Sequence, residues 1–596
     1  MPNGAGAAMM ELSAEQLAII DAPLEPMSVV ACAGSGKTRT AVRRLAEIRK
    51  RLGDHRGRVA LLSFSNVAVD TFRQSYQSLV QALSPGIGRD RVEIDTLDGF
   101  ITSNVLRPHG HRTMGCDRTP FLIAGTEPFL RNKDLRFWVQ SATEDFPVQP
   151  VDMRKVVVNL QAGAALFHYQ QHNALLPINN GPAVAARLAE VGAYTHNLGR
   201  YWCYRALLGQ PGVLRALVRR YPHILIDEAQ DIGTLHQAIL EQLIKAGAQI
   251  SLIGDPNQGI YEFAGANGAF LTQYGQRPGV NGYGLTRNYR SVPEILALAN
   301  KLSIRTDIAE RGAPDTLHGA YFIAYKNAER EQLITAFHAA VVSAGLKTES
   351  AAVLCRGRDL ADKLAGNDAP AGQGIVKVFA QATILRDRRQ DYLGAFKLVA
   401  AGIVGLLADP PQGLIARITQ PARYREMKPL RRLIWRFTRN PDTGLPAAGL
   451  TADTQWHPLL LVRTKALLAV LDQEFGLKVA DNLGNKLAKK ALPSAPLMTG
   501  GDLAAEKDAR IRVDTVHQAK GESLDAVLYL ATKEHVSALL AGVCSELGRI
   551  GYVAATRARN LLWLGVPSNA LAELRPALLA RGFQEVGVAV AVAEPA

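Results

Sequence analysis

Short apolar runs rich in β-branched residues punctuate the chain, and a polar loop follows each of them. They occupy residues 27–31, 59–63, 223–227, 250–254, 351–355, 511–514, 526–530 and 561–565. Runs of this length, separated by helical stretches, are typical of parallel strands covered by helices on both faces of the sheet. We therefore expect an α/β protein with two such sheets.

Two long stretches lack this pattern and are rich in Ala, Leu, Arg and Gln, which favours helices. They divide the chain into interrupted domains. The first α/β domain is expected at 1–100 and 206–285 and the second at 286–360 and 506–596, with mainly helical inserts at 101–205 and 361–505.

Composition narrows the choice of partner and compartment. Lys and Arg number 68 against 54 Asp and Glu, and the net charge of +14 favours a polyanionic partner. The five cysteines are odd in number and form no CxxC pair, which fits a reducing compartment. The N-terminus has no signal-peptide pattern, and the longest apolar run, 398–408, is too short to span a bilayer. These features predict a soluble, cytoplasmic protein without a membrane partner.

A glycine-rich loop follows the first predicted strand. Residues 31–38 read ACAGSGKT and open a helix expected over 39–50, which is the context of a phosphate-binding loop. Gly34 and Gly36 let backbone N–H groups point at phosphate oxygens. Lys37 would reach the β- and γ-phosphates of ATP, and the Thr38 hydroxyl would bind Mg²⁺. The alternative is a strand–helix turn that binds nothing.

An acidic segment, DEAQD at 227–231, directly follows the third predicted strand. Asp227 would hold Mg²⁺, and Glu228 would orient or deprotonate the attacking water. Acids also favour helix N-termini, so a solvated helix start is the alternative. The phosphate loop in the same chain favours the catalytic interpretation, with ATP and Mg²⁺ as cofactors.

Together with seven further segments in order, these two motifs resemble superfamily 1 helicases of the UvrD/Rep/PcrA type. The segments are 12–16, 61–69, 94–100, 252–266, 285–296, 513–523 and 552–559. The resemblance implies two RecA-like motor domains, each interrupted by an insert, that close on ATP at their interface.

The resemblance also implies an ATP site. Gln16 would read adenine and Tyr289 would stack on it, while Gln258 would sense the γ-phosphate. Arg290 and Arg557 would reach that phosphate from the second domain, as a guanidinium suits charge spread over several oxygens. Glu522 is the candidate for the acid that faces the ribose or a phosphate. The remaining loop contacts would be Ala33, Gly34, Ser35, Gly36, Lys37, Thr38 and Arg39.

A path for single-stranded DNA is implied in the same way. Thr96, Thr515 and His517 resemble contacts to the strand backbone. The set that pockets unstacked bases would be Phe64, Asn66, Tyr261 and Phe263. Core packing is the alternative for the aromatic residues. Asp98 stands near a position where relatives carry histidine, and an acid beside a DNA backbone is unfavourable.

The densest cationic stretch lies in the second insert. It holds Arg417, Arg423, Arg425, Lys428, Arg431, Arg432, Arg436 and Arg439, interleaved with Tyr424, Trp435 and Phe437. One interpretation is a contact to the DNA backbone, where relatives touch duplex. The other is a solvated amphipathic helix whose arginines snorkel to water.

These observations predict an ATP-dependent translocase and helicase that moves 3′ to 5′ on single-stranded and tailed duplex DNA. One alternative is a DNA-stimulated ATPase subunit that senses DNA for a partner nuclease, since residues 521–526 and 552–557 resemble the Gabija-type antiphage subset. Another is an ATP-gated DNA-binding scaffold. The full set of predicted catalytic residues disfavours the scaffold.

Overall fold

The computed structural model describes residues 11–82, 91–123, 125, 127–171, 174–262, 265–365, 372–411, 413–421, 424–498 and 511–586. The chain forms two compact units. The first comprises residues 1–120, 134–365 and 511–596, and the second comprises 121–133 and 366–510. Both predicted α/β domains belong to the first unit, while the second unit covers most of the predicted insert at 361–505.

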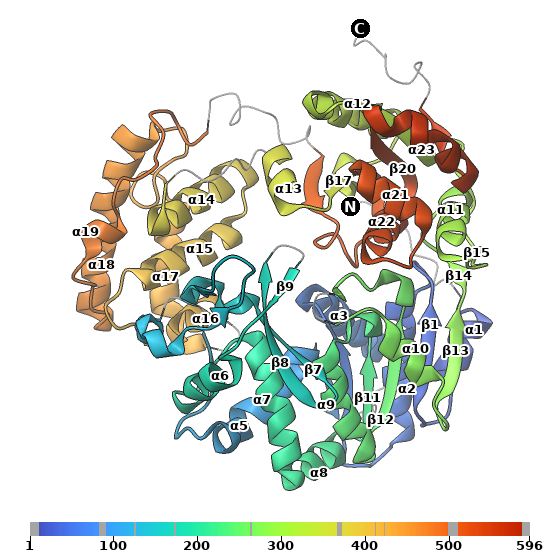
Figure 1. The fold of residues 1–596 in the computed structure, drawn as a ribbon, viewed down its shortest axis with the longest axis horizontal. Helices are drawn as coiled ribbons and strands as arrows, with labels where there is room; N and C mark the ends of the chain where they lie inside the picture. Colours follow the sequence, from blue (N-terminus) through green and yellow to red (C-terminus); the bar gives the residue numbers. More distant parts are fainter. Residues whose placement is uncertain are drawn as a thin grey trace. The chain divides into compact units, whose positions relative to one another are not determined.

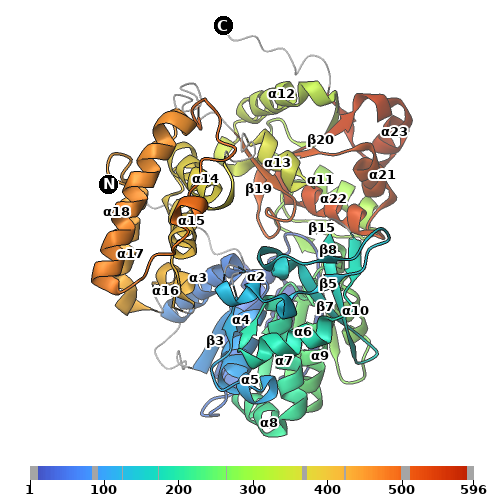
Figure 2. The same cartoon turned by 60° about the vertical axis from the view of Figure 1, so that its left-hand side comes forward.

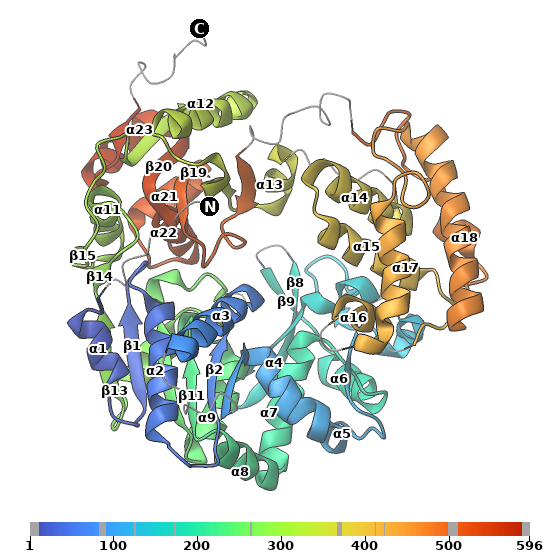
Figure 3. The same ribbon diagram turned by 180° about the vertical axis from the view of Figure 1, so that it is seen from behind.

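The first sheet has six parallel strands in the order β13-β1-β12-β11-β2-β3. These are β1 (Met27–Ala31), β2 (Val59–Ser63), β3 (Val92–Thr96), β11 (His223–Ile226), β12 (Gln249–Gly254) and β13 (Asn281–Leu285). Helices α1 (Ala14–Ile20), α2 (Lys37–Arg51) and α3 (Asn66–Ala82) pack on one face (Figure 3). Helix α10 (Ala269–Gly275) packs against β1 on the other face, where Ser28 donates a hydrogen bond to the Leu271 carbonyl.

The second sheet also has six parallel strands, in the order β18-β17-β19-β20-β16-β21. These are β16 (Gly319–Tyr325), β17 (Ala351–Cys355), β18 (Arg512–Thr515), β19 (Leu524–Leu530), β20 (Ala558–Pro567) and β21 (Gln584–Glu585). Helices α12 (Arg330–Ser343) and α13 (Arg358–Leu364) cover one face. The other carries α11 (Pro293–Ser303), α21 (Lys533–Ala541), α22 (Glu546–Arg557) and α23 (Ser568–Arg581) (Figure 1).

The two sheets confirm the predicted fold class. All eight predicted strands are present, and the helix expected over 39–50 is α2. Within these two sheets the sequence pattern missed β3, β13, β16 and β21. Strand β13 reads NGYGL and lies at the edge of its sheet, so it needs few apolar residues.

The first predicted insert, 101–205, is less helical than its composition suggested. It contains α5 (Arg107–Met114), α6 (Gly181–Glu190) and the start of α7 (His196–Gly209). Helices α8 (Pro211–Arg220) and α9 (Thr234–Lys245) follow after the insert. It also holds an antiparallel sheet of β7 (Val156–Gln161), β8 (Ala164–Gln171) and β9 (Ala174–Pro177). Strand β8 alternates in burial because one face is solvated, and such a strand is easily misread in an alanine-rich segment.

The second unit is built from helices that run alongside one another (Figure 2). They are α14 (Gly374–Arg389), α15 (Tyr392–Gly405), α16 (Leu414–Thr419), α17 (Lys428–Arg439), α18 (His457–Phe475) and α19 (Leu483–Lys486). Their apolar faces enclose a core of their own around Phe379, Trp456 and Leu471.

Within the described residues no single helix is long and apolar enough to cross a bilayer, although the bent pair α21 and α22 passes the same test jointly.

Candidate ATP and DNA site

The phosphate loop joins β1 to α2 and adopts a tight backbone turn. Gly34 and Gly36 have φ values of 72° and 80°. This backbone conformation is energetically unfavourable for any L-residue that has a side chain. The Lys37 ammonium donates to the Cys32 carbonyl at 3.2 Å, and the Ser35 hydroxyl donates to the same oxygen at 2.9 Å. The loop is therefore held in shape by its own residues, with Thr38 in the first turn of α2.

The acidic segment leaves the end of β11 beside this loop. Asp227 is buried, and its Oδ1 has no hydrogen-bond partner among the described residues. Glu228 has a φ of 55°, which is uncommon for a residue other than glycine. This left-handed backbone turns the chain directly after the strand and brings the Glu228 carboxylate to the Gln230 amide, which donates to it. Strain of this kind is concentrated at functional sites.

The three acids of this segment differ in protonation. Burial and the neighbouring charge of Glu228 raise the pKa of Asp227 to about 7. Burial also raises the pKa of Asp231 to about 6, although Lys520 opposes the rise. Burial disfavours ionised Glu228 as well, but the charges of Lys37 and Lys520 outweigh it and lower the pKa of Glu228. Glu228 is thus the carboxylate that stays ionised and available as a base.

Two arginines of the second α/β domain lie against the first. Arg557 donates from Nη2 to Gln258 Oε1 at 2.9 Å, and Gln258 in turn donates to the carboxylate of Asp255 at 2.8 Å. Arg290 packs closely on the phosphate loop. A Cβ atom added to Gly34 would lie only 2.4 Å from the Cβ atom of Arg290. Burial and repulsion by Arg557 lower the pKa of Arg290 to about 9. Arg557 is buried and Arg290 is half-buried, and two guanidinium groups this close, both withdrawn from water, favour an anion between them.

Lys520, a residue that was not among the predicted site residues, makes another bridge between the two domains. Its ammonium donates to both carboxylate oxygens of Asp231, at 2.6 and 2.7 Å, and to the Gln258 carbonyl at 2.8 Å. It also lies 4.8 Å from the centre of the Tyr261 ring. The side chains of Lys520 and Asp231 are 8% and 5% exposed, so this is a buried ion pair. The sequence signal that could have identified Lys520 is its position directly before Gly521, within the segment 513–523 that resembles the helicase family.

The two predicted adenine contacts, Gln16 and Tyr289, both lie against the phosphate loop. Gln16 accepts from the Ser13 backbone at 3.2 Å and donates to the Ser35 carbonyl at 3.2 Å, so it caps α1 and supports the phosphate loop. Asn288, another residue that the sequence analysis missed, donates to the Ala33 carbonyl at 2.5 Å. The next residue, Tyr289, donates its backbone N–H to the Gly34 carbonyl at 3.0 Å.

Arg39 and Glu522 complete the predicted ATP set. Arg39 lies in the first turn of α2, where burial and then the charge of Arg43 lower its pKa. Glu522 pairs through its carboxylate with Arg512, and its backbone carbonyl accepts from Arg557 at 3.1 Å. Its carboxylate thus forms a surface ion pair within the chain.

A cleft of about 720 Å³ runs past this site. Thr38, Asp227 and Glu228 line it on one side. Its walls also include the predicted DNA-binding residues Phe64, Tyr261 and His517. Asp231, Lys520 and Glu522 line it as well. The cleft therefore joins the candidate catalytic acids to the candidate DNA aromatics within one space.

The predicted base-binding residues differ in their surroundings. Phe64 is half-buried and meets the ring of His236 edge-on, with centroids 5.5 Å apart. Tyr261 meets His517 in the same way at 5.6 Å. Asn66 is exposed at the start of α3. Phe263 lies outside the described residues.

The two predicted threonine contacts already have partners. The Thr96 hydroxyl caps α4 (Leu97–Ile101) by accepting from Gly99 N–H at 2.9 Å. The Thr515 hydroxyl donates to the Gln518 side chain at 2.9 Å. Neither threonine lines the cleft. A donated bond from Thr515 to a phosphate would require its hydroxyl to leave Gln518, whereas the Thr96 hydroxyl accepts its bond and keeps its O–H to donate.

Asp98 is not an unpaired acid on the DNA path. Arg200 donates to both of its carboxylate oxygens, at 2.8 and 2.6 Å, and the His236 ring lies 2.9 Å away. Although burial opposes ionisation, these partners hold the pKa of Asp98 well below its ordinary value. The acid therefore fixes Arg200 and His236 in the cleft wall, and the expected repulsion of DNA is offset by the arginine.

Two parallel α/β domains, with a phosphate loop on one and arginines of the other packed against it, define a P-loop protein of the two-RecA-domain class. Residues 12–176 and 185–278 match the model of the UvrD/REP helicase N-terminal domain. Over these residues the chain is similar to the UvrD/REP superfamily 1 helicases.

Individual relatives are distant. The chain is 26% identical over 310 residues to the ATP-dependent DNA helicase UvrD2 of Mycobacterium tuberculosis, covering 49% of this chain and 43% of the relative. It is 24% identical over 427 residues to the putative ATP-dependent DNA helicase YjcD of Bacillus subtilis, covering 62% and 54%. For DNA helicase II of Escherichia coli the figures are 25% over 305 residues, 49% and 40%. The chain thus spans about half the length of these relatives.

Proposed function

We propose that the chain is an ATP-dependent translocase that moves 3′ to 5′ on single-stranded DNA and unwinds tailed duplexes. The observation that carries the proposal is the shared cleft, which is lined by Asp227 and Glu228 at one place and by Phe64 and Tyr261 at another. A motor needs such a connection, because each hydrolysis step must change its grip on the strand.

The charges around the phosphate loop suit a triphosphate. Lys37 stands at the start of α2, where backbone N–H groups favour an anion. Arg290 and Arg557 repel each other when no anion separates them. A γ-phosphate between them would relieve that repulsion and would gain a partner for each guanidinium. Closure of the two domains on ATP follows from this gain.

The donor set also fits Mg²⁺. Asp227 offers an oxygen that has no partner among the described residues, and the Thr38 hydroxyl lines the same cleft. Bound there, the ion would neutralise charge on the phosphate oxygens. Glu228, whose pKa is lowered, would take the proton of the attacking water.

Gln258 provides the link between nucleotide and DNA. Its side chain holds Arg557, so that arginine must leave Gln258 when it turns to a phosphate. Its carbonyl is held by Lys520, which lies over Tyr261. A change at the γ-phosphate therefore acts on the ring that we expect to stack on a base. Stacking on aromatics tolerates any sequence, which suits a protein that walks along DNA.

Strand displacement on duplexes with a 3′ tail, a 5′ tail or blunt ends tests the proposal. We expect ATP-dependent unwinding of the 3′-tailed duplex alone. Lys37→Ala should abolish both turnover and unwinding, and Lys50→Ala, an exposed lysine on the same helix, should leave both unchanged.

The outcomes separate the alternatives. DNA-stimulated turnover without displacement on any substrate would favour the ATPase subunit that senses DNA for a partner nuclease. Parental turnover in Lys37→Ala would remove the phosphate-loop assignment. DNA binding that responds to ATP without any hydrolysis would favour the gated scaffold.

A further inference from the structure

Helix α17 in the second unit has an apolar face and a cationic face. Leu430, Ile434 and Phe437 are buried in the core of that unit. Lys428, Arg432, Arg436 and Arg439 are exposed and follow one another at helical spacing. From Lys428 to Arg439 the helix rises about 16 Å. At about 3.4 Å per phosphate of a stacked strand, the row matches roughly five nucleotides.

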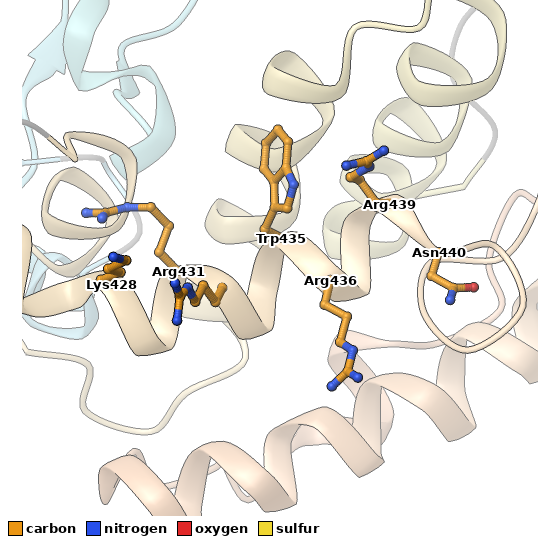
Figure 4. Close-up of a pocket in the computed structure, with 7 residues that line it drawn as sticks. Lys428, Arg431, Trp435, Arg436, Arg439 and Asn440 are labelled. Carbon is orange, nitrogen blue, oxygen red and sulfur yellow. The ribbon is translucent and has the colours of Figure 1, made fainter.

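An open groove of about 510 Å³ follows this row. Besides these four cations and Arg431, it is lined by Trp435 and Asn440 (Figure 4). Trp435 is half-buried and meets Phe396 edge-on, with centroids 5.2 Å apart. Arg439 lies 5.6 Å from the ring centre of Tyr392, which is 36% exposed. Aromatic rings thus stand among the cations rather than apart from them.

Arg431 belongs to the fold and not to the groove's free charge. Its guanidinium donates to the Ile418 carbonyl at 2.7 Å, and to those of Arg417 and Tyr424 at 3.1 Å each. Arg417 itself pairs with Glu426 at 3.6 Å. Arg423, part of the same cationic stretch, lies outside the described residues. The snorkelling-helix interpretation therefore suits Arg431, while the exposed row needs another explanation.

We propose that the α17 groove is a second binding site for single-stranded DNA, distinct from the cleft beside Phe64 and Tyr261. The proposal rests on the proposed function only in taking DNA as the ligand. The four exposed cations would contact phosphates, and Trp435 would stack on an unpaired base.

The groove's chemistry favours a single strand over other polyanions. In a duplex the bases are stacked on each other, so a tryptophan among phosphate contacts has no base face to meet. An anionic membrane would require the apolar face of the helix to enter the lipid. In α17 that face is already buried against Phe379, Phe396 and other core residues.

Binding stoichiometry provides the test, using the whole chain and an oligothymidylate of about eight nucleotides, a length within the usual range of single-strand sites. We expect two strands to bind per chain. Arg432→Glu/Arg436→Glu and, separately, Trp435→Ala should remove one of them, with a loss of about 5- to 150-fold in affinity for the Trp435 variant. Trp435→Phe should restore it. Lys465→Ala/Lys490→Ala removes two exposed cations of the same unit that do not line the groove, and should bind as the parent does.

Each contrary outcome overturns the proposal. A parent that binds one strand has no second site, and two strands retained in both groove variants would place that site elsewhere. Loss of blunt-duplex binding in the charge variant, with Trp435→Ala unaffected, would assign the groove to duplex backbone. Binding of the parent to phosphatidylserine vesicles, lost in the charge variant, would assign it to lipid. DNA-stimulated ATPase activity, measured in parallel, reports on the proposed function separately.

Discussion

Replacing Lys520 with methionine tests the buried bridge between the two α/β domains. Lys520→Met keeps the length of the side chain but leaves Asp231 buried without its partner. Removing one member of a buried ion pair costs about 3–5 kcal/mol. For a domain of this size, about 3 kcal/mol corresponds to a fall in Tm of roughly 6–12 °C.

The second variant, Lys520→Met/Asp231→Asn, distinguishes the pair from the packing around it. Because no uncompensated charge remains, we expect the double variant to recover most of the stability that the single variant loses. Thermal unfolding of the parent, both single variants and the double variant gives the coupling free energy. Additive losses would refute the inference that the two charges stabilise each other.

The same bridge should carry a functional signal. Lys520 also holds the Gln258 carbonyl and lies over Tyr261. We therefore expect both Lys520→Met and the double variant to lose the stimulation of ATP turnover by single-stranded DNA, while basal turnover survives in the double variant. Stimulation at the parental level in the double variant would show that the signal takes another route.

Three further predictions concern the first sheet and its loops. Glu228→Gln should bind ATP yet lose about 10²- to 10⁴-fold in turnover, because the base is gone while Asp227 is intact; nucleotide binding and turnover check this, and a parental rate would place the base elsewhere. Gly34→Ala should lower both Tm and ATP affinity, since its Cβ would clash with Arg290, whereas Gly53→Ala, strained but with nothing within 4 Å, should lower Tm only slightly. Burial lowers the pKa of His223 from 6.5 to about 4, so the unfolded chain takes up the proton first. The stability that His223 contributes is complete above pH 6.5 and falls below it by about 1.4 kcal/mol per pH unit, to a total loss of about 3 kcal/mol at pH 4. Thermal unfolding between pH 8 and 5 should show a smaller fall for His223→Gln; equal falls would contradict the assignment.

Much of the architecture can be predicted from the sequence because buried parallel strands are apolar along their whole length. That rule identified the central strands β1, β11 and β17. It failed for β13, whose edge position demands little hydrophobicity, and for β8, which is buried on one face only. Edge and half-solvated strands are specified by partners far away in the chain, and local composition does not reveal those partners.

The site divides in a similar way. The phosphate loop and the acids could be predicted because their chemistry sits in contiguous residues. The bonds between distant segments could not, such as Lys520 with Asp231 or Arg200 with Asp98. Asp98 shows the physical reason most clearly: alone it predicts repulsion of DNA, and only the fold supplies the arginine that compensates it.

The backbone of Glu228 has a consequence for selection. A residue other than glycine in this conformation costs about 1–3 kcal/mol, and asparagine tolerates it better than glutamate. Glu228→Asn would relieve this strain, but it would also remove the proposed base and the attraction of the carboxylate to Lys37 and Lys520. A population screened for heat resistance alone would accept the change only if the strain relieved exceeds the attraction lost. Backbone comfort and catalytic charge therefore pull the choice of residue at this position in opposite directions.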